Sequence, residues 1–430
     1  MLKRFTAIAV IAILAASLVA CNTPADSGTS AAQSSAASQV TSADTTAKTE
    51  SKTDKASQNA VVTSANVTAS GKIDATDLFT ERDLTQTADL SEAKTIALSD
   101  GQNVSITEAG VYVLSGSAKN VTVTVDAADD AKVQLVLDGV SVINTDFPAI
   151  YVKNADKVFV TTQGDNSLSV TGSFTADGST NTDAVIFSKD DLVLNGTGTL
   201  TISSTDNGIT SKDDLKITGG TITIDCVSDA IEANDTIAIA DGTVTVNSQK
   251  DGLHAEKESD DTKGMIYICG GSLTVNAADD AVHATAIVQI DGGTLDLTAS
   301  EGIESTYIQI NGGTIKIAAS DDGINAGRKS SSYEVAVEIT NGDITVNMGA
   351  GDTDGIDSNG NLYISGGTVD ITCQSPFDYD GNAEYTGGTL IVNGTETNEI
   401  TNQMMGGGMG GMRGGMRGGD MQQMQQMPQN

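Results

Sequence analysis

The sequence contains no tryptophan and only 8 tyrosines and 7 phenylalanines in 430 residues. It is also poor in basic residues, because 23 Lys and Arg face 57 Asp and Glu, which gives a formal net charge of −34. Such a chain repels phosphate groups, which argues against a nucleic-acid binder and against a basic membrane-surface protein. The scarcity of aromatic rings argues against the stacking platforms that hold many neutral glycans. We therefore expect cations, or anions bridged by cations, as partners.

The chain also lacks a hydrophobic run long enough for a stable membrane span. Lys3 and Arg4 precede a short apolar stretch, residues 5–19, which is typical of a secretory signal. Residues 18–21 read Leu-Val-Ala-Cys and resemble the lipobox of bacterial lipoproteins. The resemblance implies cleavage before Cys21 and acylation of its thiol, and the alternative is an ordinary signal peptide with an unmodified cysteine. An acylated Cys21 would hold the protein on the extracellular face of the cell membrane, with the lipid anchor as its only membrane contact.

We divide the chain into four parts by composition. They are a lipoprotein signal peptide at 1–20, a tether rich in Ser, Thr and Ala at 21–71, a folded domain at 72–398, and a tail rich in Gly, Met and Gln at 399–430. The tether has almost no large apolar side chain, so we expect it to stay extended. The tail holds most of the 11 methionines. Thioethers can bind soft metals such as Cu(I), but a glycine-rich tail without Cys or His is more typical of disorder.

A repeat explains the 46 glycines. From about residue 195 onward, Gly-Gly-Thr or a close variant recurs mostly every 20 to 22 residues, as at 219–221. Each repeat contains three short segments of alternating apolar and polar residues, which indicate β-strands. Three strands in a coil of about 22 residues predict an all-β fold, a parallel β-helix in which successive coils stack about 4.8 Å apart. Small inward residues (Ile, Val, Leu and Ala) would fill its thin core, and the glycine pair would supply the positive φ of a turn.

The segment before this regular region follows the same alternation less evenly, from about residue 77 to 201. We expect Leu78, Phe79 and residues 83–93 to cover the N-terminal end of the core, because a stack of repeats needs a cap. The cysteines after residue 21 are odd in number and far apart, so we expect half-buried strand residues rather than disulfides.

A second motif follows each Gly-Gly-Thr strand: an acidic residue, then Ala or Gly, an aliphatic residue and a polar residue. Because coils stack in register, the motif predicts two adjacent columns of polar side chains, which we take as candidate metal ligands. The first column contains Asp229, Asp251, Asp280, Glu301, Asp322 and Asp354. The second column contains Glu232, His254, His283, Glu304, Asn325 and Asp357, and Asp378 follows in the last coil.

Neighbouring carboxylates in such a column would repel each other by roughly 3 kcal/mol at an effective dielectric constant near 20. Divalent cations or raised pKa values would relieve this repulsion. Carboxylate and amide oxygens suit Ca²⁺, whereas His254 and His283 could hold Zn²⁺ or another borderline metal, or face solvent without a metal. Each first-column Asp could also be only a turn residue that caps the backbone.

The sequence resembles a bacterial surface family, the carbohydrate-binding domain-containing proteins, from about residue 72 to 398. The resemblance rests on the Gly-Gly-Thr repeats and on segments 78–83, 110–116, 140–144 with 149–151, and 377–381. It implies a right-handed, single-stranded parallel β-helix of pectate-lyase-like shape. It also implies binding of Ca²⁺ and of acidic polysaccharide of the polygalacturonate type, or of cellulose.

These observations leave three hypotheses for the function. The first is a lipid-anchored binding protein whose Ca²⁺ ions bridge its own carboxylates to those of an acidic glycan. The second is a calcium-dependent polysaccharide lyase, for which Lys250 and Arg328 are the candidate bases. The third is a surface scaffold or adhesin. We expect a binding protein rather than an enzyme, and the sequence does not determine the oligomeric state.

Overall fold

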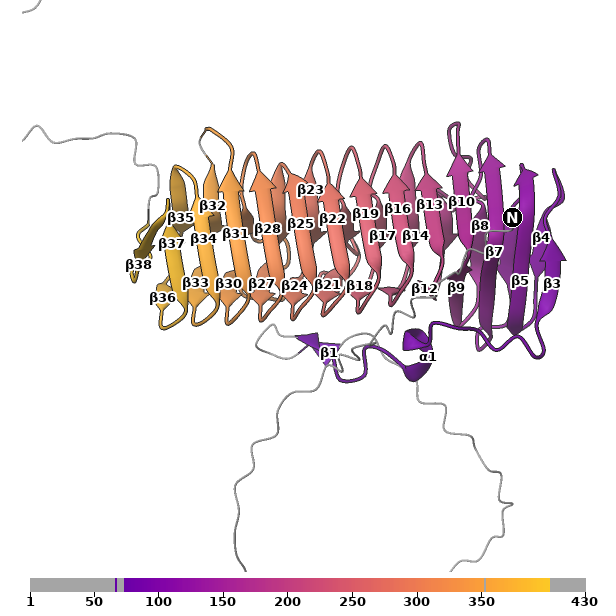
Figure 1. Cartoon of the computed structure of the whole chain (residues 1–430), viewed down its shortest axis with the longest axis horizontal. Helices are drawn as coiled ribbons and strands as arrows, with labels where there is room; N and C mark the ends of the chain where they lie inside the picture. Colours follow the sequence, from indigo (N-terminus) through magenta and orange to yellow (C-terminus); the bar gives the residue numbers. More distant parts are fainter. Residues whose placement is uncertain (1–65, 68–72, 352, 403–430) are drawn as a thin grey trace, which may run out of the picture. The chain divides into compact units, whose positions relative to one another are not determined.

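The computed structural model describes residues 66–67, 73–351 and 353–402, and these form the stacked coils of a parallel β-helix (Figure 1). The predicted signal peptide with Cys21, nearly all of the tether and most of the tail lie outside these residues. The short α1 (Glu81–Leu84) is the one α-helix in the described part of the chain. No helix there is long and apolar enough to cross a membrane. The all-β prediction is confirmed.

Each regular coil contributes one strand to each of three parallel ladders. In one coil these are β16 (Thr221–Asp225), β17 (Ile231–Ala233) and β18 (Thr236–Ile239), and in the next β19 (Thr243–Asn247), β20 (Leu253–Ala255) and β21 (Met265–Ile268). Residue pairs between the two coils are in parallel register in all three ladders. The predicted coil of three strands is therefore confirmed.

The first ladder continues in both directions with β10 (Asp165–Val170), β13 (Thr199–Ser203), β22 (Ser272–Asn276), β25 (Thr294–Ala299), β28 (Thr314–Ala319), β31 (Asp343–Met348), β34 (Thr368–Thr372) and β37 (Thr389–Val392). The second ladder continues with β4 (Val104–Ile106), β6 (Val123–Asp126), β8 (Ile150–Asn154), β11 (Ala184–Ser188), β14 (Asn207–Ser211), β23 (Asp280–Ala284), β26 (Glu301–Ser305), β29 (Ile324–Ala326), β32 (Asp354–Ser358) and β35 (Ser375–Tyr379). The third ladder continues with β9 (Lys157–Gln163), β12 (Asp191–Gly196), β15 (Leu215–Ile217), β24 (Ile287–Ile290), β27 (Tyr307–Ile310), β30 (Ala336–Ile339), β33 (Asn361–Ile364) and β36 (Ala383–Tyr385).

The N-terminal coils are irregular because two long strands serve two ladders at once. β7 (Lys132–Asn144) pairs with β9 through its first half and with β10 through its second half. β5 (Gly110–Lys119) pairs along β7, and β3 (Lys94–Ala97) pairs with β5. The first and third ladders therefore merge into one sheet at this end. The remaining strands form antiparallel pairs: β1 (Asn66–Val67) with β2 (Ile73–Asp74), and β38 (Thr395–Thr397) with β37.

The core is the thin aliphatic interior that the alternation predicted. In β16, Ile222 and Ile224 are 1% and 0% exposed, while the threonines between and before them face outward. The two positions of each Gly-Gly-Thr turn require glycine for different reasons. The second has a positive φ, for example 96° at Gly293. The first is required by a close approach, since a Cβ on Gly270 would lie 2.2 Å from the carbonyl oxygen of Ala240.

The segment that we expected to cap the N-terminal end of the core lies elsewhere. We call residues 73–93 the strap. The strap lies along the outer face of the third ladder, where Ile73 and Leu78 are buried against Met265, Tyr267 and Ile287 (Figure 1). It does not close the N-terminal end of the core as expected. The physical reason is that the third ladder carries apolar side chains on its outward face as well, so both faces must be removed from water.

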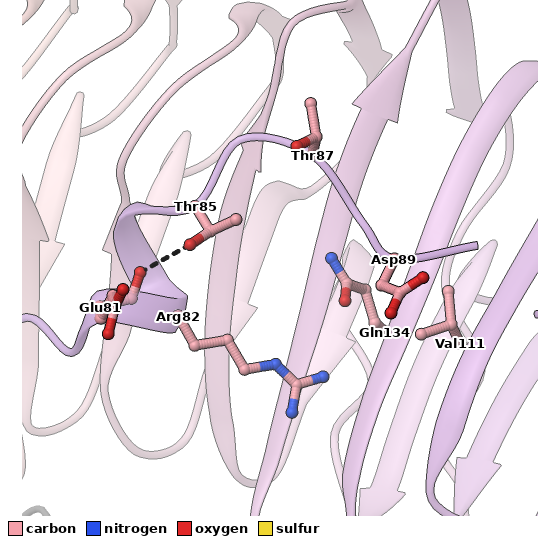
Figure 2. A pocket seen from close by; sticks show the side chains of 7 residues that line it. All are labelled: Glu81, Arg82, Thr85, Thr87, Asp89, Val111 and Gln134. Atoms are coloured by element: carbon pink, nitrogen blue, oxygen red, sulfur yellow. Dashed lines mark hydrogen bonds between the residues drawn. The ribbon is translucent and has the colours of Figure 1, made fainter. Parts of the chain in front are cut away.

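Where the strap passes β5 and β7 it leaves a shallow cavity of about 370 Å³ (Figure 2). Figure 2 shows Arg82 on the strap side of this cavity and Val111 and Gln134 on the strand side. The Arg82 guanidinium lies 4.4 Å from the centre of the Phe159 ring. Burial lowers the pKa of Arg82. None of the groups of metal-binding side chains in the described residues lies in this cavity.

Candidate metal-binding face

The second column lies on the outward face of the second ladder, one residue per coil. Glu232 pairs in register with His254, and His254 with His283. The register continues through Glu304, Asn325, Asp357 and Asp378. In β20 the residues on either side of His254, Leu253 and Ala255, are fully buried, so strand alternation turns the middle residue outward.

The first column lies where these strands begin, either as the first residue of the strand or in the turn just before it, and it has a structural role of its own. The backbone N–H of Asp251 donates to Oδ1 of Asp229, and the N–H of Asp280 donates to Oδ1 of Asp251, each at 3.0 Å. The N–H of Asp354 donates in the same way to Oδ1 of Asp322, at 3.2 Å. Glu301 continues the column opposite Asp280. One oxygen of these aspartates therefore caps the next coil, and the other is left for a second partner.

The two histidines meet at the centre of the face. His254 Nδ1 lies 2.6 Å from Asp251 Oδ2, and His283 Nδ1 lies 3.3 Å from the same oxygen. His283 Nδ1 is also 3.1 Å from Asp280 Oδ2 and 3.7 Å from Glu304 Oε2. The two ring centres are 4.8 Å apart. These side chains line a cavity of about 430 Å³ together with Asp229, Lys250, Asp279 and Glu301.

The histidines and carboxylates shift each other's protonation. Burial opposes charge on His283, but its hydrogen bonds to Asp251 and Asp280 outweigh burial and raise the pKa of His283 to about 10. The pKa of His254 is raised against the same effect of burial by its hydrogen bond to Asp251. Burial alone would favour the neutral acid at Asp251, but the two imidazoles hold its pKa well below the usual range. Burial raises the pKa of Asp280 to about 6.

We call the first- and second-column residues of one coil a rung. In two rungs a lysine side chain pairs with the second-column carboxylate, and sequence reasoning missed both lysines. Lys212 Nζ lies 2.7 Å from Glu232 Oε1, and Asn207 and Thr210 donate to the other oxygen of Glu232. Lys329 Nζ lies 2.6 Å from Glu304 Oε1. Both carboxylates are thus partly neutralised. Lys212 follows a second-ladder strand directly and could have been aligned with the rungs, whereas Lys329 lies in a loop whose path the sequence does not predict.

The downstream rungs, from Glu301 onward in the chain, differ in the protonation and hydrogen bonding of their carboxylates. Burial, followed by the neighbouring carboxylates, raises the pKa of Glu301 to about 8, of Asp322 to about 6 and of Asp357 to about 7. Asn325 donates to Glu301 Oε2 at 3.0 Å, but Asn325 Oδ1 and Asp378 Oδ1 are buried and accept no hydrogen bond within the described chain. No Lys or Arg of the described residues forms an ion pair with these groups. Buried acceptors without donors, in an all-oxygen setting, fit a hard cation such as Ca²⁺.

Two further groups of carboxylates can be compared with the columns. Asp279 joins Asp251 and Asp280 in an all-oxygen group at the cavity. Asp213, Asp214 and Asp235 form another, which the sequence did not suggest, outside both columns. There, Lys257 and Lys263 lie 2.6 and 3.0 Å from the two oxygens of Asp235, so cations of the chain itself already balance part of the charge.

The two candidate bases of the lyase hypothesis lie in different places. Lys250 lines the central cavity beside Asp251. Arg328 is exposed and is not part of that lining.

Comparisons with known proteins found one family model, one curated relative and one solved structure. The family model described as carbohydrate-binding domain-containing protein matches residues 100–350 and 300–398. A curated protein of the same description from Acetivibrio thermocellus is 36% identical over 124 residues, which is 28% of this chain and 43% of that protein. The chain thus matches less than half of this relative's length. A solved structure described as a polysaccharide lyase-like protein from C. thermocellum, in a gadolinium derivative, covers 67% of this chain and 99% of its own, with 24% identity and a TM-score of 0.41.

Proposed function

Because the chain belongs to the family of carbohydrate-binding domain-containing proteins, we propose that it binds an acidic polysaccharide of the polygalacturonate type through Ca²⁺ ions. The observation that carries this proposal is the group formed by Glu301, Asp322, Asn325, Asp357 and Asp378. These residues combine raised carboxylate pKa values, buried acceptors without donors, and no basic partner among the described residues.

The charge of the face supports a cation-bridged mode of binding. An acidic surface repels an acidic polymer, and divalent cations between the two convert this repulsion into attraction. Ca²⁺ takes six to eight oxygen ligands and so accepts oxygens from two molecules at once. Glu301, Asp322, Asn325, Asp357 and Asp378 would hold the ions from the protein side.

The placement of the aromatic residues supports the same mode. Tyr267 and Tyr307 are 2% and 6% exposed and lie beneath the strap, and Tyr151 and Phe187 are 2% and 0% exposed. These rings are not available as a stacking platform for sugars. Coordination by carboxylates does not need such a platform.

The sequence supports a place for this activity on the extracellular face of the cell membrane, with Cys21 as the lipid anchor. Substitution Cys21→Ala would then release the protein from the membrane fraction into the medium. The check is immunodetection in both fractions of the producing bacterium. Equal membrane retention of both forms would argue against the anchor.

A lyase is the second candidate, because Lys250 lines the central cavity. A base there would have to reach the proton α to a uronate carboxyl group. Binding without cleavage favours the first proposal, and unsaturated product favours the lyase.

The deciding experiment measures retention of the purified protein on polygalacturonate with Ca²⁺ and with EGTA, together with the absorbance of unsaturated product. We expect calcium-dependent retention and no product. Retention that EGTA does not change would contradict the calcium bridge, and no retention under either condition would favour a scaffold or adhesin.

Substitutions in the ladder sharpen this test. Asp322→Asn keeps an oxygen that can accept the N–H of Asp354 but removes the negative charge. Asp357→Asn removes a negative charge from the second column. Together they should lower retention by on the order of tenfold or more, because an ion loses two anionic ligands. Asp296→Asn is the matched control, since Asp296 is exposed on the outward face of β25, away from both columns.

A further inference from the structure

We propose that His254, His283 and Asp251 form a Zn²⁺ site that is separate from the calcium-binding rungs. The three side chains come from two neighbouring coils, and their ligand atoms already converge. His254 Nδ1 and His283 Nδ1 lie 2.6 and 3.3 Å from one oxygen, Asp251 Oδ2. The side chains are 19%, 18% and 7% exposed, so the site is largely shielded from water.

The spacing of these atoms fits a tetrahedral ion. Zn²⁺ binds imidazole nitrogen and carboxylate oxygen at about 2.0 to 2.2 Å, which places tetrahedral ligands about 3.3 to 3.6 Å from one another. The distance from His283 Nδ1 to Asp251 Oδ2 already meets this value at 3.3 Å, and the distance from His254 Nδ1 needs to open from 2.6 Å. Three protein ligands leave the fourth position on the 430 Å³ cavity that these side chains line.

A hydrogen bond on the far side of His254 supports metal binding through Nδ1. His254 Nε2 lies 3.3 Å from Glu256 Oε2, so Nε2–H can donate to this carboxylate when a metal ion takes the place of the proton on Nδ1. Metal-bound histidines usually donate their second ring N–H to a carboxylate in this way, which fixes the tautomer and the ring orientation.

Two loops, residues 256–264 and 327–335, flank this part of the face. Glu256 begins the first loop, and Lys329, which holds Glu304 beside His283, lies in the second. The loops are tied together, because Asp261 in the first accepts hydrogen bonds from the backbone and hydroxyl of Ser331 in the second at 2.8 and 2.7 Å. Ser331 and Lys329 lie in the same loop, so this contact ties the loop that carries Lys329 to the loop that carries Glu256.

The choice of metal follows from the donor atoms. Imidazole nitrogens favour Zn²⁺ and similar borderline ions, whereas Ca²⁺ prefers oxygen alone. The downstream rungs offer only oxygens and the central pair offers two nitrogens. The two kinds of ion should therefore bind different coils of the same face.

The experiment titrates the purified, chelator-treated protein with Zn²⁺ by calorimetry and with Co²⁺ by visible absorption, without glycan. We expect one equivalent to bind, with the intense d–d bands of a tetrahedral Co²⁺ site. His283→Ala should abolish these bands, and Glu256→Gln should weaken binding by roughly 10- to 100-fold while the ligands stay in place. Asp357→Asn, on the same face, should leave both titrations unchanged.

Absence of the bands in the unchanged protein, or bands of equal intensity in His283→Ala, would overturn the proposal and leave the pair as an ion-paired surface cluster. Since the probe is the metal alone, failure of calcium-dependent glycan binding would not affect this result. Retention of His283→Ala on polygalacturonate with Ca²⁺ would show that the two sites are independent.

Discussion

Asp83 fixes the strap through one buried carboxylate. It is 0% exposed, and its oxygens lie 3.5 and 3.6 Å from the ammonium groups of Lys157 and Lys216, which are themselves buried. Asp83 also completes a capping box with Thr80 at the start of α1. Lys216 Nζ donates to the carbonyl of Leu78 at 2.6 Å, so a single charge network joins the strap to the third ladder.

We expect Asp83→Ala to destabilise the protein by about 3 to 5 kcal/mol, because it removes the ion-pair partner of the buried Lys216 and leaves Lys157 with Asp191 alone. The measurement is the free energy of unfolding in urea. Asp89→Ala, at an exposed aspartate of the same segment, should change it by less than about 0.5 kcal/mol. Equal effects of the two substitutions would show that the buried network does not hold the strap.

Within the second-ladder strands, glycine is required by packing between coils rather than by backbone dihedrals. Gly302 follows Glu301 in β26 and has no positive φ. A Cβ at this position would lie 2.4 Å from the carbonyl oxygen of Gly323 in the next coil, and 2.4 Å from Cγ2 of Ile317. This close approach explains the glycine in this coil, whereas Ala230 and Ala281 stand at the same place of the motif in two other coils.

Gly302→Ala should therefore destabilise the protein by about 1 to 3 kcal/mol, the usual cost of inserting a methyl group into a packed interior. Gly327→Ala is the control, because a Cβ there would meet nothing closer than 3.8 Å. Urea unfolding of both variants tests the prediction. An unchanged midpoint for Gly302→Ala would mean that the coils can separate locally without cost.

For the whole molecule, the raised carboxylate pKa values connect stability to pH. The pKa of Glu301 is about 8 and that of Asp357 about 7, mainly because of burial. The folded protein therefore holds protons that the unfolded chain, with ordinary carboxyl pKa values near 4, has released. The stability that these groups contribute is present below the unfolded pKa and is lost as the pH rises through the folded pKa.

We expect the urea midpoint in EDTA to fall between about pH 5 and about pH 8. Ca²⁺ should reduce this fall, because an ion that binds only the folded state replaces the lost protons and stabilises that state. Glu301→Gln should show a flatter profile, since it removes the group with the highest of these carboxyl pKa values. A midpoint that rises over this range, with or without Ca²⁺, would contradict the assignment.

The sequence alone determined the coil, the aliphatic core and the two polar columns. These follow from local rules: alternation decides which side chains face outward, and a constant repeat length brings equivalent residues into register. His254 and His283 could therefore be assigned to adjacent rungs without coordinates, and the register confirms this. Whether the columns bind metal stays a prediction.

Only the tertiary structure decided where the strap lies and which rungs keep a free charge. The strap pairs residues far apart in the chain, such as Leu78 with Lys216, and no local pattern specifies such a contact. Likewise, Lys212 and Lys329 neutralise Glu232 and Glu304 through long, flexible side chains whose direction depends on their surroundings. Periodicity fixes the position of a charge along the coil, but its partners are fixed only when the whole chain has packed.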